Sequence, residues 1–341
     1  MHKKMAFIKN ILASNFTRLQ SPYKITFAVT YKCNLKCKIC KIWQNPPQRE
    51  VGIEEIERIF KSLSNLSWID LTGGEITLRE EIIEIIKVII KNSDKILIFH
   101  ISTNGQLPDK MFLIVKEILK LDVVPFINVS IDGPQLINDR LRGVNGAYEA
   151  SLETFNKLKQ FTKIHCYLSC TLSNFNINSV DDLLSALKKE IQNFDFSDMH
   201  FNIFHASAHY YNNHGIDGSV NSNPGMIKNY LSLCKKGHSV KVFLENEYLK
   251  GVDYFLQGNK FPVKCQALNA TCFIDPFGRI YPCGMYSEVL GELSSCNFDF
   301  KKIWNSEKSS QIRRSIQAKK CPGCWSPCEA YPAILGCLIN R

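Results

Sequence analysis

The stretch Ile25-Thr26-Phe27-Ala28-Val29, followed closely by Cys33-Asn34-Leu35-Lys36-Cys37-Lys38-Ile39-Cys40, decides the interpretation of this chain. The apolar run is typical of a buried strand. The three cysteines that follow this run are separated by three and two residues, and the first comes just after the strand ends. Iron–sulfur cubanes are normally held by four cysteine thiolates. A local group of three therefore predicts a cubane with one iron left open to bind a substrate or cofactor.

Two other interpretations of these cysteines have less support. Structural zinc sites usually combine paired Cys-x2-Cys units or added histidines, and no histidine lies between His2 and His100. Disulfides need an oxidising compartment, and residues 1–20 lack the apolar core and cleavage site of a secretory signal. We therefore expect reduced thiols and a cytoplasmic location.

The composition is that of an ordinary globular protein. With 341 residues, 45% of them hydrophobic, the chain is long enough for one large domain and one small one. The formal net charge of +10 permits an acidic substrate. The basic residues are dispersed and no nucleic-acid-binding motif is present, so we expect no nucleic-acid partner.

Residues 24 to about 207 alternate between short β-branched runs and longer amphipathic segments, the pattern of repeated βα units. This pattern predicts an α/β protein whose six parallel strands curl into a partial (β/α)6 barrel. The predicted strands are 24–30, 68–72, 95–102, 123–131, 163–172 and 199–206, and the predicted helices are 53–64, 79–91, 109–121, 147–160 and 180–190. We assign 1–21 to an N-terminal segment, 22–240 to the barrel, 241–264 to a connector and 265–341 to a small cysteine-rich domain.

Polar residues follow several predicted strands, and in βα barrels the functional loops gather at these carboxyl ends. Gly73 and Gly74 allow close backbone approach to a ligand, and Glu75 can accept a hydrogen bond from an ammonium group. The third and fourth strands end in short polar side chains that suit ribose hydroxyls, although plain strand-ending turns remain the alternative. These side chains are Ser102, Asn104, Ser130 and Asp132.

The cluster loop, the Gly-Gly-Glu segment and Leu141-Arg142-Gly143 together resemble the radical S-adenosylmethionine (SAM) superfamily. This resemblance implies that the open iron chelates the amino and carboxylate groups of SAM, and that one electron cleaves SAM to a 5'-deoxyadenosyl radical. It assigns Gly73, Gly74 and Glu75 to the amino group, Arg142 to the carboxylate, and Ile39 to the adenine. Ser102, Asn104 and Ser130 would hold the nucleoside, and Asp132 ranks below them. Ile76 stands where relatives usually have proline.

The density of cysteines in the sequence rises after Gly258. Cys265 and Cys283 flank a predicted hairpin turn at 275–278, and Cys321-Pro322-Gly323-Cys324 adds a second pair, with Cys328 close behind. The arrangement resembles the SPASM or shorter twitch domain, which implies an auxiliary 4Fe-4S cluster held by Cys265, Cys283, Cys321 and Cys324, with Cys328 a further candidate. A second auxiliary cluster, for which Cys272, Cys328 and Cys337 are available, and a zinc ribbon are the alternatives.

Two further segments carry predictions. Met5, Ile8, Leu12, Phe16 and Leu19 form an apolar stripe among basic residues, for which we favour packing on the barrel over peripheral membrane contact through residues 1–20. The polar run from His205 to His214 is expected to border the substrate opening. Cys166 and Cys170, within a predicted strand, are expected to be structural.

The combined prediction is an enzyme that abstracts a hydrogen atom from an unactivated C–H site, most simply to oxidise its substrate. Modification of a peptide, as in maturases of ribosomal peptides or sulfatases, is the second candidate. A non-catalytic metal-binding interaction protein is the candidate from another class. The expected partners are a small-molecule, lipid-linked or peptide substrate and a reductase such as flavodoxin or ferredoxin.

Overall fold

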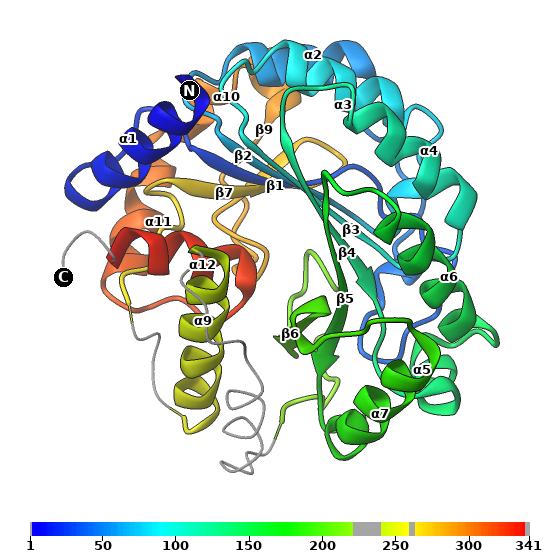
Figure 1. Cartoon of the computed structure of the whole chain (residues 1–341). Coiled ribbons are helices and arrows are strands. Elements are labelled where there is room, and N and C mark those ends of the chain that lie inside the picture. The colour runs from blue at the N-terminus through cyan, green and yellow to red at the C-terminus, as the bar shows by residue number, and fades with distance from the viewer. Residues whose placement is uncertain (1, 221–239, 259–262, 338–341) are drawn as a thin grey trace.

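The computed structural model describes residues 2–220, 240–258 and 263–337. Its centre is a curved sheet with the strand order β6-β5-β4-β3-β2-β1-β7-β8-β9 (Figure 1). The first six strands are parallel and are connected by helices, so the predicted α/β partial barrel is confirmed. The strands are β1 (Lys24–Ala28), β2 (Trp68–Thr72), β3 (Ile98–Thr103), β4 (Val124–Ser130), β5 (His165–Leu172), β6 (Met199–Ile203), β7 (Thr271–Ile274), β8 (Arg279–Tyr281) and β9 (Gly291–Glu292).

The outer layer consists of the crossover helices. The helices are α1 (His2–Phe16), α2 (Ile53–Lys61), α3 (Ile82–Lys91), α4 (Pro108–Ile118), α5 (Gln135–Arg142), α6 (Ala147–Lys159), α7 (Val180–Glu190), α9 (Val240–Leu256), α10 (Phe300–Trp304), α11 (Glu307–Gln317) and α12 (Pro327–Cys337). Short 3-10 turns are η1 (Ile42–Gln44), η2 (Ile76–Leu78), η3 (Ile177–Ser179), η4 (Phe196–Asp198) and η5 (Leu293–Cys296). All five predicted helices are present, whereas α5, α9, α10, α11 and α12 were not predicted.

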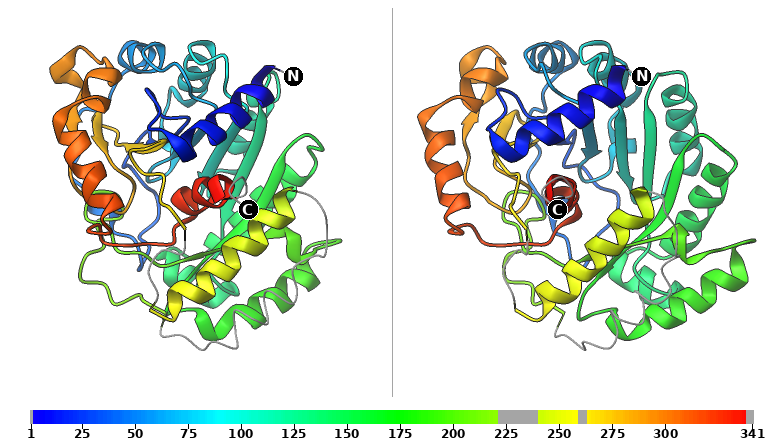
Figure 2. Two further views of the ribbon diagram at one scale, coloured as in Figure 1. Left: turned by 90° about the vertical axis from the view of Figure 1, so that its left-hand side faces the viewer. Right: turned by 60° about the vertical axis from the view of Figure 1, so that its left-hand side comes forward.

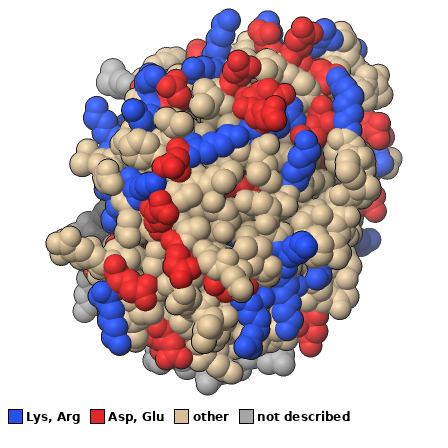
Figure 3. Space-filling model, turned by 90° about the vertical axis from the view of Figure 1, so that its right-hand side faces the viewer, with Lys and Arg blue, Asp and Glu red and all other residues tan. Residues whose placement is uncertain are grey.

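The hydrophobic core lies between the sheet and these helices. Helix α3 shows why these helices pack on the sheet. Its isoleucines recur at helical spacing and form one apolar face, on which Ile82, Ile85, Ile86 and Ile89 are buried. Cys166 and Cys170 on β5 belong to the same core, as expected for structural cysteines. The outer face that carries α4 and α6 shows Lys and Arg interspersed with Asp and Glu (Figure 3).

The cysteine-rich tail continues the barrel sheet. Strand β7 pairs in parallel with β1, from Lys24↔Thr271 to Phe27↔Ile274, and turns back antiparallel into β8. The hairpin turn predicted at 275–278 is therefore confirmed. The edge of β1 is covered in this way, which leaves no unpaired backbone there. The predicted connector contains α9, which packs against α12.

Helix α1 packs on the end of the barrel where the strands begin, but not through the predicted stripe. Its inward face carries Phe7, whose ring meets Tyr23 and Trp68 edge to face, and Asn10, which donates to the Asn65 carbonyl and the Ser67 hydroxyl. Of the stripe, only Leu19 is buried, and the other four side chains are exposed. The prediction that the stripe itself packs is thus wrong for those four residues. Figure 2 shows α1 on the outside of the molecule.

A buried ion pair joins β1 to β2 near this end of the barrel. Lys24 Nζ lies 2.7 Å from Asp70 Oδ2, and the two side chains are 1% and 6% exposed. Burial alone would raise the pKa of the Asp70 carboxyl, but Lys24 and His100 more than offset this and hold that pKa well below its usual range. Removing one partner would leave a buried charge uncompensated.

We therefore expect Lys24→Met to lower the free energy of unfolding by about 3–5 kcal/mol, measured by urea denaturation. The double variant Lys24→Met, Asp70→Leu should recover much of that loss, because the Asp70 carboxylate that Lys24 neutralised is then absent as well. Lys157→Met, which removes a lysine from a pair with the exposed Asp109, serves as the control and should change little. An equal effect of Lys24→Met and Lys157→Met would contradict the assignment.

Candidate active site

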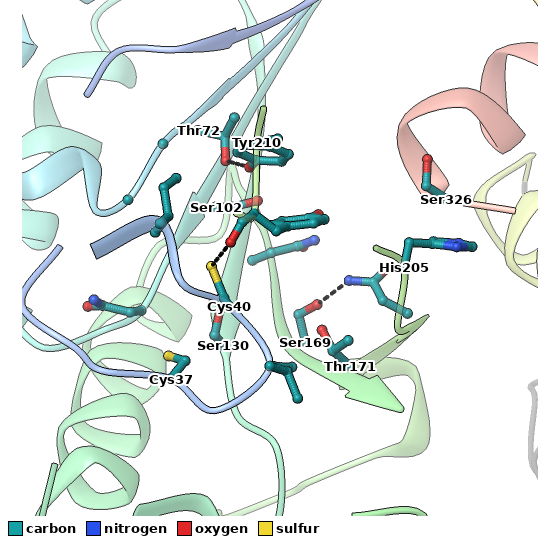
Figure 4. A pocket seen from close by; sticks show the side chains of 18 of the residues that line it. Cys37, Cys40, Thr72, Ser102, Ser130, Ser169, Thr171, His205, Tyr210 and Ser326 are labelled. Carbon is teal, nitrogen blue, oxygen red and sulfur yellow. Dashed lines mark hydrogen bonds between the residues drawn. The ribbon is translucent and has the colours of Figure 1, made fainter. Parts of the chain in front are cut away.

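A cavity of about 240 Å³ opens at the carboxyl ends of the barrel strands (Figure 4). Eleven of the twelve residues predicted for the radical cluster and for SAM line it. They are Cys33, Cys37, Ile39, Cys40, Gly73, Gly74, Ser102, Asn104, Ser130, Asp132 and Arg142. The exception is Glu75. The fold therefore brings residues from five separate segments of the chain into one site.

The cluster loop is held in place by backbone contacts with the end of α5. The amides of Lys36 and Lys38 donate to the carbonyls of Arg142 and Leu141, at 3.0 and 2.7 Å. Gly143 makes this approach possible, since a Cβ there would stand 2.5 Å from the Lys36 carbonyl oxygen, and its φ of +72° favours glycine. The far side of the loop is held by Tyr211 and Asn213, which bond to the backbones of Lys41 and Ile39.

Cys33, Cys37 and Cys40 face the cavity from this loop. Burial raises the pKa of Cys33 to about 11 and of Cys40 to about 12, and the neighbouring thiols add to both shifts. In the described part of the chain no three His, Cys, Asp or Glu side chains are arranged to share one metal ion. Thiolates on a cubane bind different irons, so three thiols around one cavity are the number of ligands that a cubane with one open iron requires.

The glycines after β2 form a backbone cradle beside the cluster loop. The amides of Gly74 and Glu75 donate to the carbonyls of Thr30 and Lys32, each at 2.8 Å. A Cβ on Gly74 would stand 2.2 Å from the Lys32 oxygen, so only glycine fits there. Gly73 and Gly74 therefore line the same cavity as the cysteines of the cluster loop.

Glu75 is buried and does not line the cavity. Its oxygens accept hydrogen bonds from the backbone and hydroxyl of Thr77, the Thr103 hydroxyl and the Asn104 amide, at 2.6 to 3.0 Å. These bonds give Glu75 a positioning role, because they fix the loop that carries Asn104. Contact of its carboxylate with the SAM amino group stays a prediction.

Arg142 and Asp132 form a buried pair that the sequence did not reveal. Arg142 Nη2 lies 2.8 Å from Asp132 Oδ2, and Asp132 Oδ1 accepts a hydrogen bond from the Thr171 amide at 2.9 Å. Burial raises the pKa of the Asp132 carboxyl, although Arg142 acts in the opposite direction. The Nε of Arg142 is buried without a hydrogen-bond partner in the described structure. An open donor on a fixed guanidinium is what a carboxylate ligand requires.

Four other thiols form a second group next to the cavity. Cys265, Cys283, Cys321 and Cys324 lie close enough that their charges act on one another, and burial is the main cause of the raised pKa values of Cys265, Cys283 and Cys324. Four neighbouring thiols match the donor set of one cubane. Cys272, which a second auxiliary cluster would use, lies on strand β7 and is buried in the core.

Cys328 stands apart from these four. It lines the main cavity, and the groups that act on its thiol are Lys24, Asp70, Glu329 and Thr26 rather than other cysteines. Its carbonyl accepts from Lys24 Nζ at 2.8 Å. The structure thus places Cys328 in the cavity wall, and its role as an auxiliary ligand stays a prediction.

Sequence reasoning missed the polar floor of the cavity. Thr26, Asp70 and His100 stand in register on β1, β2 and β3, and His100 Nδ1 lies 3.4 Å from Asp70 Oδ1. More polar side chains line the cavity from β4 to β6: Asn128, Ser169, Thr171, His200 and Asn202. The available signal was polar residues at alternate positions of otherwise apolar strands.

The polar run after β6 borders the cavity only in part. His205, Tyr210, Tyr211 and Asn213 line it, and the Tyr210 hydroxyl lies 2.5 Å from the Thr72 hydroxyl. His205 Nε2 accepts from the Trp325 amide at 3.3 Å, and burial lowers the pKa of His205 to about 4. His209 stacks on Tyr281 instead, with ring centroids 4.1 Å apart.

Comparisons with known proteins agree with this geometry. The radical SAM superfamily model matches residues 27–187, and the SPASM model of an iron-sulfur cluster-binding domain matches 265–325. The chain is 24% identical to an AdoMet-dependent heme synthase of Nitratidesulfovibrio vulgaris, covering 92% of this chain and 86% of that protein. It is also 24% identical to the mycofactocin maturase MftC of Mycolicibacterium smegmatis, covering 92% and 78%.

The fold is shared with a solved structure, native anSMEcpe with bound AdoMet and Kp18Cys peptide. Its TM-score is 0.59 at 17% identity, covering 88% of this chain and 86% of that one. The chain belongs to the radical SAM superfamily and carries a SPASM-type domain. It is therefore an enzyme that uses SAM and 4Fe-4S clusters.

The assignment of Cys324 to the second thiol group, and of Cys328 outside it, can be tested. After anaerobic reconstitution the wild-type protein should bind about eight irons per chain, and Cys324→Ala about four, because one cubane loses a ligand. Cys328→Ala is the matched control, four residues away, and should keep about eight. Iron and sulfide analysis measures both. Loss of about four irons in Cys328→Ala, with Cys324→Ala unaffected, would reverse our assignment.

Proposed function

We propose that this enzyme oxidises its substrate by two electrons at an unactivated C–H site. When bound, SAM and the radical cluster supply the 5'-deoxyadenosyl radical that removes the hydrogen atom. The observation that carries the proposal is the course of one short segment. Cys321 and Cys324 belong to the second thiol group, and Ser326, Pro327 and Cys328 immediately beyond them line the cavity. An auxiliary cluster on these thiols would stand next to the substrate and could accept its second electron.

The chain also offers an acceptor for the proton. For an alcohol substrate, the C–H hydrogen atom goes to the 5'-deoxyadenosyl radical, the remaining electron to the auxiliary cluster and the hydroxyl proton to a base, which leaves a carbonyl. His100 lines the cavity with Nδ1 toward the Asp70 carboxylate, so Nε2 is its free proton acceptor. Asp70, kept ionised by Lys24, stabilises the imidazolium that forms.

Peptide modification is the second candidate. The mycofactocin maturase supports it, as does the structural neighbour solved with a bound peptide. The cavity wall contains Trp43, Tyr210 and Tyr211 as well as polar groups, so an extended chain with aromatic or polar side chains would also find contacts.

For the electron that starts the reaction we propose a low-potential protein reductant such as flavodoxin or ferredoxin, in the cytoplasm, where thiols stay reduced. Lysines stand next to every cysteine of the cluster loop, and Lys32, Lys36 and Lys38 are exposed. Such a basic collar would attract an acidic reductant to the shortest path to the cluster.

We further propose peripheral membrane contact through residues 1–20.

The collar predicts a salt-sensitive electron supply. Lys36→Glu with Lys38→Glu should slow 5'-deoxyadenosine formation about tenfold with reduced flavodoxin, through slower association, and flatten its dependence on ionic strength. The exposed pair Lys188→Glu, Lys189→Glu on α7 is the matched control. Dithionite should support equal rates in all variants. Equal rates with flavodoxin would rule out the collar without affecting the proposed reaction.

The radical reaction itself is tested by 5'-deoxyadenosine release from SAM and dithionite. Wild type should form it and Cys37→Ala should not. Arg142→Lys should weaken SAM binding by about tenfold, because lysine lacks the bidentate fork, whereas the exposed Arg140→Lys should not. The rate as a function of SAM concentration measures this. Iron uptake without 5'-deoxyadenosine in wild type would contradict the proposed function.

A further inference from the structure

Helix α1 (His2–Phe16) carries apolar side chains on two opposite faces. Phe7 and Ile11 face inward and join a buried cluster with Tyr23. The outward face carries Met5, Ile8, Leu12 and Phe16, which are 63%, 55%, 38% and 75% exposed. A helix that is apolar on both sides is expected to be covered on both. In the described structure, only the inward side is.

The outward face is unusual for this molecule. Among the described residues seven large hydrophobic side chains are exposed, and four of them form this stripe. The other three, Leu113, Leu136 and Tyr254, lie on α4, α5 and α9. Single exposed apolar residues need no explanation, whereas a contiguous stripe marks an interaction site.

The charges beside the stripe indicate what covers it. At 100° per residue, Lys4 and Lys9 flank the apolar face on its two sides, and both are exposed. The first acidic residue of the chain is Glu50, so residues 1–49 carry no carboxylate side chain to neutralise them. An apolar stripe between lysines is the pattern of a helix that lies in a membrane interface and whose ammonium groups reach anionic headgroups.

We propose that the outward face of α1, namely Met5, Ile8, Leu12 and Phe16 with Lys4 and Lys9, docks the enzyme on the surface of an anionic lipid bilayer. No helix in the described ranges is both long and apolar enough to cross a membrane, and α1 in this proposal lies flat. The inference is independent of the reaction, because it needs neither SAM nor a cluster.

The place of α1 in the fold is compatible with catalysis at a membrane. Phe7 contacts Trp68 at the start of β2, whereas the cluster loop follows the end of β1. The lipid-facing helix and the cavity mouth therefore lie toward opposite ends of the parallel strands. Docking through α1 leaves the basic collar free for a reductant. A second copy of the chain fits the stripe less well, since a two-fold contact would bring the lysines of both copies together.

The test is flotation of the reconstituted full-length protein with vesicles of phosphatidylcholine alone or mixed with phosphatidylglycerol. Wild type should float with the mixed vesicles and much less with phosphatidylcholine alone. The triple variant Ile8→Gln, Leu12→Gln, Phe16→Gln should reduce this binding by about tenfold or more. Lys4→Glu with Lys9→Glu should abolish the preference for phosphatidylglycerol, and salt should weaken wild-type binding.

Leu113→Gln with Leu136→Gln, which removes two exposed apolar side chains outside α1, is the matched control and should float like wild type. Because all substituted residues are exposed, each variant should keep the wild-type melting curve and 5'-deoxyadenosine formation. Absence of wild-type flotation would overturn the proposal, as would wild-type flotation of the triple variant. A wild-type dimer that the triple variant converts to monomer, without vesicle binding, would assign the face to a second copy instead.

Discussion

Strand β1 is paired in parallel on both of its edges, with β2 on one side and β7 on the other. Parallel strands end at the same edge of a sheet, so this pairing brings three segments together. The cluster loop leaves β1, the glycine cradle leaves β2, and the hairpin of the tail starts from β7. All five residues of β1 are buried, which fixes its register. The active site depends on this arrangement.

The second consequence of the pairing is that the second thiol group lies next to the cavity that the cluster loop lines. The tail is attached to the barrel through β7, and the segment from Cys321 to Cys328 passes from the auxiliary thiols into the cavity wall. His205 reinforces this connection, because it accepts a hydrogen bond from the backbone of Trp325. A substrate in the cavity would therefore lie between a source of radical chemistry and an electron acceptor. The Lys24, Asp70 and His100 cluster adds a fixed charge distribution to the floor of the same space.

Much of this could be predicted from the sequence, because local patterns determined it. The spacing of Cys33, Cys37 and Cys40 identified the cluster loop, and β-branched runs located all six barrel strands to within a few residues. Helix α5 was missed because it is short and polar. Its role is clear only in the structure, where Gly143 at its end packs against the Lys36 carbonyl. The Asp132–Arg142 pair links the loop after β4 to helix α5, and the polar floor joins residues of different strands. Alternating polar positions mark single floor residues, but no local pattern encodes which side chains meet.

One prediction failed for a physical reason. A helical stripe of apolar residues shows that one face avoids water but does not show which face the fold covers, so α1 was placed with the wrong side inward. For α1, tertiary packing decided between two faces that the local sequence left equal. The role of Cys328 stays a prediction, because α12 begins at Pro327, between Cys324 and Cys328, and Cys328 lines the cavity.

The central claim is that three cysteines leave one iron for SAM while four others complete a separate cubane. Mössbauer spectroscopy of protein reconstituted with ⁵⁷Fe, recorded with and without SAM, tests it directly. We predict two cubanes per chain and a changed signal from about one iron in eight when SAM is added. Two cubanes whose irons are all unaffected by SAM, or a single cubane with zinc on the remaining thiols, would contradict the account.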